Sequence, residues 1–207
     1  MSKRIFGLFI LAALLLPVAA KADSVSPGWE FTSVNSQRSS SNVYTFGIVF
    51  TANSDMWVNY LGYYDPTGGM NYTHLVGLFD VTTETLLAYT TVTSDSDYSS
   101  AHFLYNAITP VELLNGDEYV LEGVSGDLNG TDYYTNNVSG FAVNAPITIN
   151  GANYQINVVG GLSFDSSTGS PNYYGPDFGL TPEPNSLWLL GSGLAGLAGL
   201  IKRKLMA

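Results

Sequence analysis

Two groups of oxygen-bearing side chains in expected loops have the residue types that bind a hard cation. Asp95 and Asp97 flank a serine, and the segment DLNGTD contains Asp127, Asn129 and Asp132. Calcium takes carboxylate and carbonyl oxygens from such loops. Neither group completes the calcium loop that ends in a bidentate glutamate. Two interpretations of these residues therefore remain: a calcium site, and the simpler one, that they are solvated acidic loops.

Aromatic side chains in polar loops offer a second chemistry, which is contact with sugars. Tyr133 and Tyr134 lie in one polar stretch, and Tyr173 and Tyr174 lie in another. An exposed tyrosine has an apolar face and a polar edge, so it can pack on a sugar ring. The alternative is that these rings are core or ordinary surface residues. Tyr133 and Tyr134 are the candidate glycan contact.

Residues for catalysis are sparse. The chain has two histidines, His74 and His102, and no cysteine, and it lacks the H-E-x-x-H, G-x-S-x-G and glycine-rich phosphate motifs. We interpret both histidines as structural residues at a surface or a strand end. We expect no enzymatic activity and no cofactor other than the calcium considered above. A polysaccharide hydrolase, with two carboxyl groups about 5–10 Å apart across a cleft, is a less favoured alternative.

The distribution of charge excludes one class of partner. All but one of the 17 acidic residues lie between positions 23 and 181, where Arg38 is the only basic residue. Such a segment repels phosphate backbones, so we expect no nucleic-acid binding. Cations and neutral glycans remain compatible with it.

The elements that position these side chains are predicted to be β-strands, because apolar residues alternate with a period of two through the middle of the chain. The expected strands cover residues 43–51, 56–64, 74–80, 85–93, 101–108, 119–124, 138–143, 147–150 and 154–159. Residues 81–84 are expected to close a hairpin. Asn115-Gly116, Asn129-Gly130 and Asn150-Gly151 tolerate positive φ and are expected to be turns.

Many short strands separated by such turns favour an all-β fold. We predict an antiparallel β-sandwich of jelly-roll or immunoglobulin-like type over residues 23–162. Residues 163–181 are rich in Ser, Gly and Pro. We predict that they form an extended linker between the sandwich and the membrane.

The N-terminus has the three parts of a secretory signal peptide. Lys3 and Arg4 precede an apolar run over residues 5–18, and Ala20 and Ala22 occupy the positions that signal peptidase recognises. We therefore predict a signal peptide over residues 1–22 and export of the rest of the chain.

The C-terminus, residues 182–207, has three parts of its own. Pro182, Glu183 and Pro184 precede an uncharged run over residues 187–201, and a basic tail over residues 202–204 follows. The run is short beside the roughly 20 residues of a full span, yet it is rich in leucine and carries no charge, and we predict a single transmembrane helix. The basic tail, formed by Lys202, Arg203 and Lys204, favours a cytoplasmic end, with the acidic middle of the chain outside.

This ordered combination resembles the PEP-CTERM sorting signal of Gram-negative bacteria. The resemblance implies recognition by exosortase, a membrane enzyme, near Pro182, Glu183 and Pro184. It also implies an inner-membrane-anchored precursor, later display at the cell surface or in the extracellular matrix, and an association with exopolysaccharide and biofilm. In that case the three motif residues are the substrate of another enzyme.

Residues 44–124 resemble a recurrent bacterial extracellular module, in which a hairpin like HLVGLFD–TETLLAYTTV precedes a strand pair like ITPVELLNGDEYVLEGV. The resemblance implies a sandwich fold and no assigned activity. The favoured function is that of a non-enzymatic surface or matrix protein sorted by exosortase. The alternative is a glycan-binding or calcium-dependent matrix adhesin.

Overall fold

The computed structural model describes residues 25–66, 69–100, 102–156, 161–170 and 172–181. Every regular element in these ranges is a β-strand, and the paired strands are antiparallel, so the predicted all-β antiparallel class is confirmed. The strands are β1 (Ser26–Pro27), β2 (Trp29–Glu30), β3 (Ser33–Arg38), β4 (Tyr44–Ala52), β5 (Met56–Tyr64), β6 (His74–Asp80), β7 (Thr85–Val92), β8 (Tyr98–Ser100), β9 (Phe103–Leu113), β10 (Glu118–Val124), β11 (Gly126–Asp127), β12 (Gly130–Thr131), β13 (Tyr134–Ser139), β14 (Ala142–Val143), β15 (Ile147–Ile156) and β16 (Pro176–Leu180).

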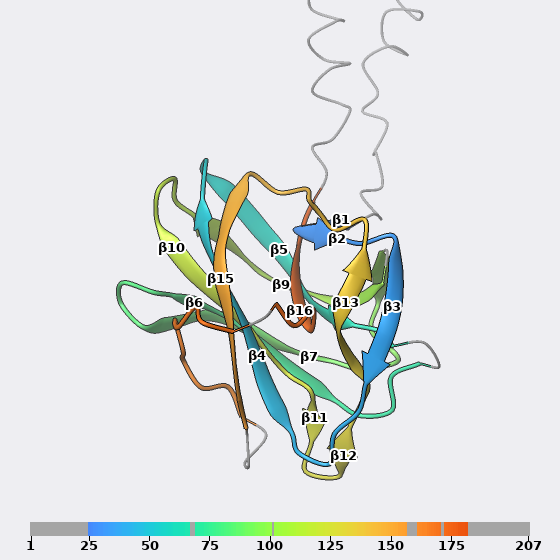
Figure 1. Ribbon diagram of the computed structural model, residues 1–207. Helices are drawn as coiled ribbons and strands as arrows, with labels where there is room; N and C mark the ends of the chain where they lie inside the picture. The colour runs from blue at the N-terminus through green and yellow to red at the C-terminus, as the bar shows by residue number, and fades with distance from the viewer. Residues whose placement is uncertain (1–24, 67–68, 101, 157–160, 171, 182–207) are drawn as a thin grey trace, which may run out of the picture. The chain divides into compact units, whose positions relative to one another are not determined.

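The strands form two five-stranded sheets and three short ribbons (Figure 1). The first sheet has the order β1-β16-β5-β9-β8, and the second has the order β15-β4-β10-β6-β7. The ribbons are β11-β12, β13-β3 and β14-β2. Strands from distant parts of the chain are therefore neighbours, and β16 lies between the first strand of the described chain and β5.

Several local predictions hold in detail. Strands β5 and β6 have the predicted bounds, and the hairpin at residues 81–84 joins β6 to β7. Gly116, in the turn between β9 and β10, has a φ of 89°, which lies in the left-handed region that glycine adopts without a steric penalty. The alternating pattern and the turn residues thus predicted these elements from local sequence.

The prediction of a turn at Asn150-Gly151 is wrong. Strand β15 continues through both residues and pairs with β4 along its whole length. The register shifts between Ile149 and Gly151, which marks a β-bulge: one extra residue is absorbed and the strand continues. The predicted strand over 138–143 is divided between β13 and β14, which pair with different partners.

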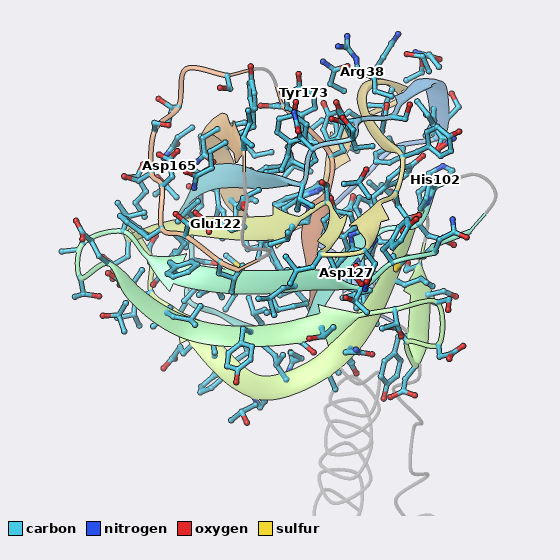
Figure 2. All side chains as sticks on the ribbon, turned by 90° about the horizontal axis from the view of Figure 1, so that it is seen from below. Arg38, His102, Glu122, Asp127, Asp165 and Tyr173 are labelled. Carbon is cyan, nitrogen blue, oxygen red and sulfur yellow. The ribbon has the colours of Figure 1, made fainter. Side chains whose placement is uncertain are left out.

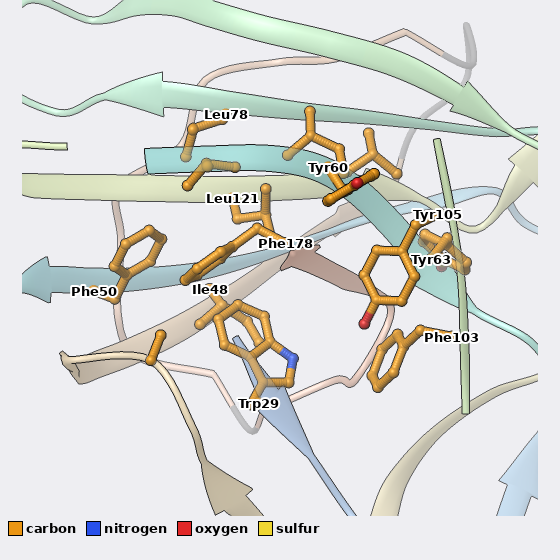
Figure 3. Close-up of a cluster of buried hydrophobic side chains, with 14 of the residues drawn as sticks. Trp29, Ile48, Phe50, Tyr60, Tyr63, Leu78, Phe103, Tyr105, Leu121 and Phe178 are labelled. Atoms are coloured by element: carbon orange, nitrogen blue, oxygen red, sulfur yellow. The ribbon is translucent and has the colours of Figure 1, made fainter. Parts of the chain in front are cut away.

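The two large sheets share one hydrophobic core, shown in Figure 3. Leu61 and Phe178 come from the first sheet, and Ile48 and Phe50 come from the second; all four are fully buried. The rings of Phe50 and Phe178 stack across the core with centroids 5.3 Å apart. Trp29 meets Phe178 edge to face at 5.4 Å. This aromatic core stabilises a chain that has no disulfide bonds.

The prediction of an extended linker over residues 163–181 is wrong, because both ends of this range pack in the folded body. Residues 161–170, which we call the strap, lie across the outer face of the second sheet. Leu162 and Phe164 of the strap pack on Val49, Phe79 and Val120. The close approach requires Gly77 in β6, because a Cβ there would lie 2.4 Å from a methyl carbon of Leu162.

The other end of the predicted linker is strand β16. It pairs with β5 on one side and with β1 on the other, and the compact unit to which these strands belong extends to Thr181. The side chains of Asp177 and Phe178 are fully buried. The Ser, Gly and Pro content of the surrounding residues suggested a solvated spacer, whereas the five residues of β16 complete a sheet.

Asp177 adds a buried polar contact to β16. The Tyr105 hydroxyl donates to Asp177 Oδ2 at 2.5 Å, and the Phe178 N–H donates to Asp177 Oδ1 at 2.8 Å. Burial raises the pKa of Asp177 well above its usual value, although these hydrogen bonds oppose the rise. The strand is therefore held by side-chain hydrogen bonds as well as by its backbone pairing.

The strap covers a second buried carboxyl group, Glu122 of β10, seen in Figure 2 beneath the segment that carries Asp165. The two Glu122 oxygens accept the N–H groups of Ser163 at 3.1 Å and of Asp165 at 2.8 Å. Burial raises the pKa of Glu122 to about 7; the two N–H groups lower it, and the Asp165 carboxylate raises it.

Glu122→Gln is expected to flatten the pH dependence of the free energy of unfolding between about pH 4.5 and 7. Glu122 has a usual pKa of 4.5 and a folded pKa of about 7, so the folded state binds its proton more tightly. Its contribution is therefore full below pH 4.5 and is lost as the pH rises through 7, by roughly 3 kcal/mol. Urea unfolding at a series of pH values measures this slope. Glu112→Gln, an exposed change on β9, is the control and should leave the slope intact; an unchanged slope in Glu122→Gln would refute the assignment.

Candidate functional site: the sorting junction and a tyrosine cluster

The last core strand ends directly beside the predicted sorting motif. Strand β16 ends at Leu180, and the N–H of Thr181 donates to Asn59 Oδ1 on β5 at 3.2 Å. Pro182 is the next residue in the sequence. We call this point, where the core strand meets the motif, the sorting junction.

The two ends of the described chain meet at the sorting junction. Ser26 of β1 pairs with Leu180 of β16, and Pro27 pairs with Gly179. Because the strands are antiparallel, the chain enters β1 and leaves β16 at the same end of the sheet.

The predicted sorting and targeting residues lie outside the described residues. These are Ala20 and Ala22 of the signal peptidase site, Pro182, Glu183 and Pro184 of the motif, the apolar run 187–201, and Lys202, Arg203 and Lys204 of the basic tail. None of the described residues forms a helix with the length and hydrophobicity that a membrane crossing requires.

Residues 180–204 match the PEP-CTERM protein-sorting motif. The match begins at the last residue of β16, so the motif overlaps the end of the folded core. The chain therefore carries a PEP-CTERM sorting signal, which implies an exported protein with a C-terminal membrane-anchoring signal and processing by exosortase. No curated protein sequence matches the chain.

One predicted calcium ligand, Asp132, accepts hydrogen bonds from the segment before β6 and from His74. Its carboxylate is buried and accepts the N–H of Asn71 at 2.8 Å, the N–H of Tyr72 at 2.9 Å and His74 Nε2 at 3.1 Å. Burial raises the pKa of Asp132, but the hydrogen bonds from His74, Tyr72 and Asn71 outweigh burial and lower it below its usual value. Asp132 thus holds the segment before β6 in place.

The other predicted calcium ligands do not converge with it. Asp127 and Asn129 belong to the β11–β12 hairpin, where the Asp127 carboxylate accepts the Asn129 N–H at 2.7 Å and the Thr73 hydroxyl at 3.0 Å. The hydrogen bond from the Asn129 N–H is the main cause that lowers the pKa of Asp127. Asp95 and Asp97 are exposed in the turn between β7 and β8. Among the described residues, no three carboxylate or histidine side chains gather as metal ligands would.

Both histidines have structural contacts. His74 opens β6, as predicted, but its side chain is fully buried. Its ring stacks on Tyr63 with centroids 4.0 Å apart, and Nδ1 lies 2.8 Å from the Val124 carbonyl oxygen. Asp132 Oδ2 faces the other ring nitrogen, Nε2, at 3.1 Å. His102 stacks on Phe31 at 4.8 Å.

Four tyrosines from separate segments meet around one end of β4, and we call them the tyrosine cluster. Tyr134 of β13 lies 5.9 Å from Tyr44 of β4 and 5.7 Å from Tyr173 (ring centroids). Tyr154 of β15 lies 6.0 Å from Tyr44 and 5.2 Å from Tyr173. Phe46 is buried beneath them, 4.9 Å from Tyr173, which Figure 2 labels.

The tyrosine cluster is partly open to solvent. Tyr154 is 44% exposed and the other three rings are half-buried. Burial, with the neighbouring Tyr44 and Tyr173, raises the pKa of Tyr134, which keeps its hydroxyl neutral and able to donate. Ile156 pairs with Tyr44 and also lines an open groove of about 300 Å³. The groove is bordered by Ser41, Asn42, Val43, Asp127, Leu128, Asn129, Gly130 and Ile156.

Of the two tyrosines predicted to contact a glycan, one belongs to the tyrosine cluster. Tyr134 belongs to it, whereas Tyr133 is 50% exposed and packs on no other aromatic ring of the described residues. Tyr174 is buried and contacts Phe31 and Phe141. Sequence reasoning missed Tyr44 and Tyr154, because their alternating positions indicated only strand residues.

Proposed function

We propose that this chain is a non-enzymatic exported protein of the cell surface or extracellular matrix, sorted and processed by exosortase and associated with exopolysaccharide or biofilm. The observation that carries the proposal is the overlap of the sorting motif with the end of β16. Because the folded body ends where the motif begins, cleavage there releases a body with every described strand intact.

The same body is best classed as an antiparallel β-sandwich of jelly-roll or immunoglobulin-like type. The chain crosses from one sheet to the other between β4 and β5, β5 and β6, β7 and β8, and β9 and β10, whereas β6-β7 and β8-β9 are hairpins within one sheet. The shared aromatic core between the sheets supports this class.

A structural use for the buried carboxyl groups supports a non-enzymatic role. Asp132, Asp177 and Glu122 each accept hydrogen bonds from groups that hold a strand or the strap in place. Groups with shifted pKa values often mark active sites, but hydrogen-bond networks of this kind shift pKa values as well.

Intact mass spectrometry of the mature protein tests the sorting proposal. In cells with exosortase, the product is expected to lack residues 187–207 and residues 1–22. In cells without exosortase, the C-terminal residues should remain. A chain that still carries Lys202, Arg203 and Lys204 in both strains would refute processing.

A matched pair of variants links the processing to the motif. Glu183→Ala is expected to leave unprocessed precursor in cells that contain exosortase. Glu84→Ala, a change of the same type on the exposed β6–β7 turn, is the control and should be processed as the wild type is.

The tyrosine cluster favours a second candidate function, which is binding of a neutral glycan such as the producer's own exopolysaccharide. Tyr154 and Tyr134 present aromatic surface and hydroxyl groups beside a polar groove. Sugar rings pack on such surfaces, and the acidic body disfavours polyanions.

Tyr154→Ala is expected to weaken retention on the purified exopolysaccharide by about 3- to 10-fold, the range that one lost ring contact predicts. Tyr89→Ala is the control, because Tyr89 is 64% exposed on β7 and has no ring partner among the described residues. Retention measured with and without EDTA separates a calcium-dependent adhesin from a calcium-independent one. Equal retention of the two variants would exclude the cluster as the glycan contact.

A further inference from the structure

We propose that the end of the body at the sorting junction contacts the outer surface of the inner membrane before processing, with the Trp57 side chain in the lipid headgroup region. This inference rests on the proposed anchoring of the precursor. Its partner is a zwitterionic lipid surface.

The length of chain beyond the body supports the contact. Thr181 is the last described residue, and the apolar run begins at residue 187, so five residues separate them. Five residues span at most about 18 Å. The headgroup region on one side of a bilayer is itself about 5–8 Å thick. The sorting junction therefore stays close to the lipid surface for as long as the apolar run is in the membrane.

An exposed aromatic residue lies at the sorting junction. Trp57 of β5 is 53% exposed and lies two residues before Asn59, which accepts the Thr181 N–H. Asn59 lies where the register of β5 and β9 shifts, and Trp57 is two residues before it on the same strand, so Trp57 is close to the point where the chain leaves β16. Tryptophan prefers the membrane interface, where its ring is partly apolar and its N–H reaches water.

A second apolar side chain lies at the same end. Leu114, in the turn after β9, is 49% exposed. The neighbouring Asn115 N–H donates to Asp55 Oδ1 at 2.8 Å, which places this turn next to the start of β5. Asp55 and Glu112 also belong to this end, and Glu112 pairs with Trp57. These acidic groups disfavour anionic lipids, so a zwitterionic surface fits best.

The contact leaves the tyrosine cluster free. The cluster is at the Tyr44 end of β4. The sorting junction is at the Ala52 end, because the Ala52 carbonyl accepts the Gly116 N–H, and the turn that contains Gly116 lies next to the start of β5. Eight steps along a strand separate Tyr44 from Ala52, or about 26 Å. A body that faces the membrane at one end therefore presents the tyrosine cluster at the other.

Quenching of tryptophan fluorescence by brominated lipids tests the contact. The full chain with Trp188→Phe retains two tryptophans, the fully buried Trp29 and the exposed Trp57. In vesicles of zwitterionic lipid with bromine near the headgroups, we expect at least a twofold quenching of the Trp57 signal. The control carries Trp57→Phe and Leu128→Trp in the same chain, since Leu128 is 79% exposed on the β11–β12 hairpin, and its added tryptophan should be quenched much less.

The outcomes separate this inference from the proposed function. If the chain co-sediments with the vesicles but both tryptophans are quenched equally, the contact is refuted and the anchoring stands. If the chain fails to co-sediment, the anchoring is refuted and the contact falls with it. Strong quenching at Trp57 alone supports both.

Discussion

A chain that ends at Thr181 is expected to fold, whereas a chain that ends at Gly175 is expected not to. The shorter chain lacks β16, so β1 loses its partner in the first sheet and β5 loses one of its two partners. It also lacks Phe178, which contacts Trp29 and Phe50 in the core. Losses of this size exceed the roughly 5–15 kcal/mol by which a domain is normally stable. Circular dichroism and thermal unfolding of the two purified chains measure the difference.

A single substitution gives a graded form of the same test. Phe178→Ala is expected to lower the free energy of unfolding by about 3–5 kcal/mol, because it leaves a cavity between the two sheets. Phe164→Ala is the control on the strap; since Phe164 is only half-buried, we expect a loss of about 1–2 kcal/mol. Similar losses of unfolding free energy in the two variants, or a folded chain ending at Gly175, would show that β16 is not essential to the fold.

Asp132→Ala is expected to lower the free energy of unfolding by about 3–5 kcal/mol. The change leaves the N–H groups of Asn71 and Tyr72 and the ring of His74 without their acceptor in a buried site. Because the pKa of Asp132 is lowered, its contribution is present above the usual value of 3.8 and is lost as the pH falls through the lowered one. Urea unfolding at neutral and acid pH measures both effects.

Asp127→Ala provides the matched control for Asp132. It removes a carboxylate from the same hairpin, but Asp127 is partly exposed, and its donors can turn to water. We expect a loss below about 1 kcal/mol. If the two variants were equally destabilised, the buried hydrogen bonds of Asp132 would not be the cause. If added calcium stabilised the wild type and not Asp132→Ala, the carboxylate would be a metal ligand.

The sequence predicted the strands well where the signal was local. The alternation in Met56–Tyr64 and His74–Asp80 predicted β5 and β6 with their observed bounds, since neighbouring residues carry the pattern. The same reasoning failed at Asn150-Gly151, because a residue pair that tolerates a turn also tolerates a bulge. Only the pairing of β15 with β4 distinguishes the two.

The candidate site was also predicted only where the signal was local. Tyr134 was found from its place in a polar stretch, but Tyr44 and Tyr154 alternate within strands and carried no local sign of exposure. The ring contacts among them depend on which strands are neighbours, and that depends on the whole topology. For Asp132 the loop sequence suggested a cation ligand, and its burial beside His74 was visible only in the fold.

By itself the sequence determined the strand-forming alternation, the glycine turn at Gly116 and the sorting signal, because a contiguous stretch of residues carries each of them. The tertiary structure alone decided that residues 163–181 belong largely to the folded body. Their composition resembles that of a solvated spacer, but the partners that bury Phe178 and Leu162 come from strands far away in the sequence. Burial is a property of pairs of surfaces, so it could not be inferred from the composition of one of them.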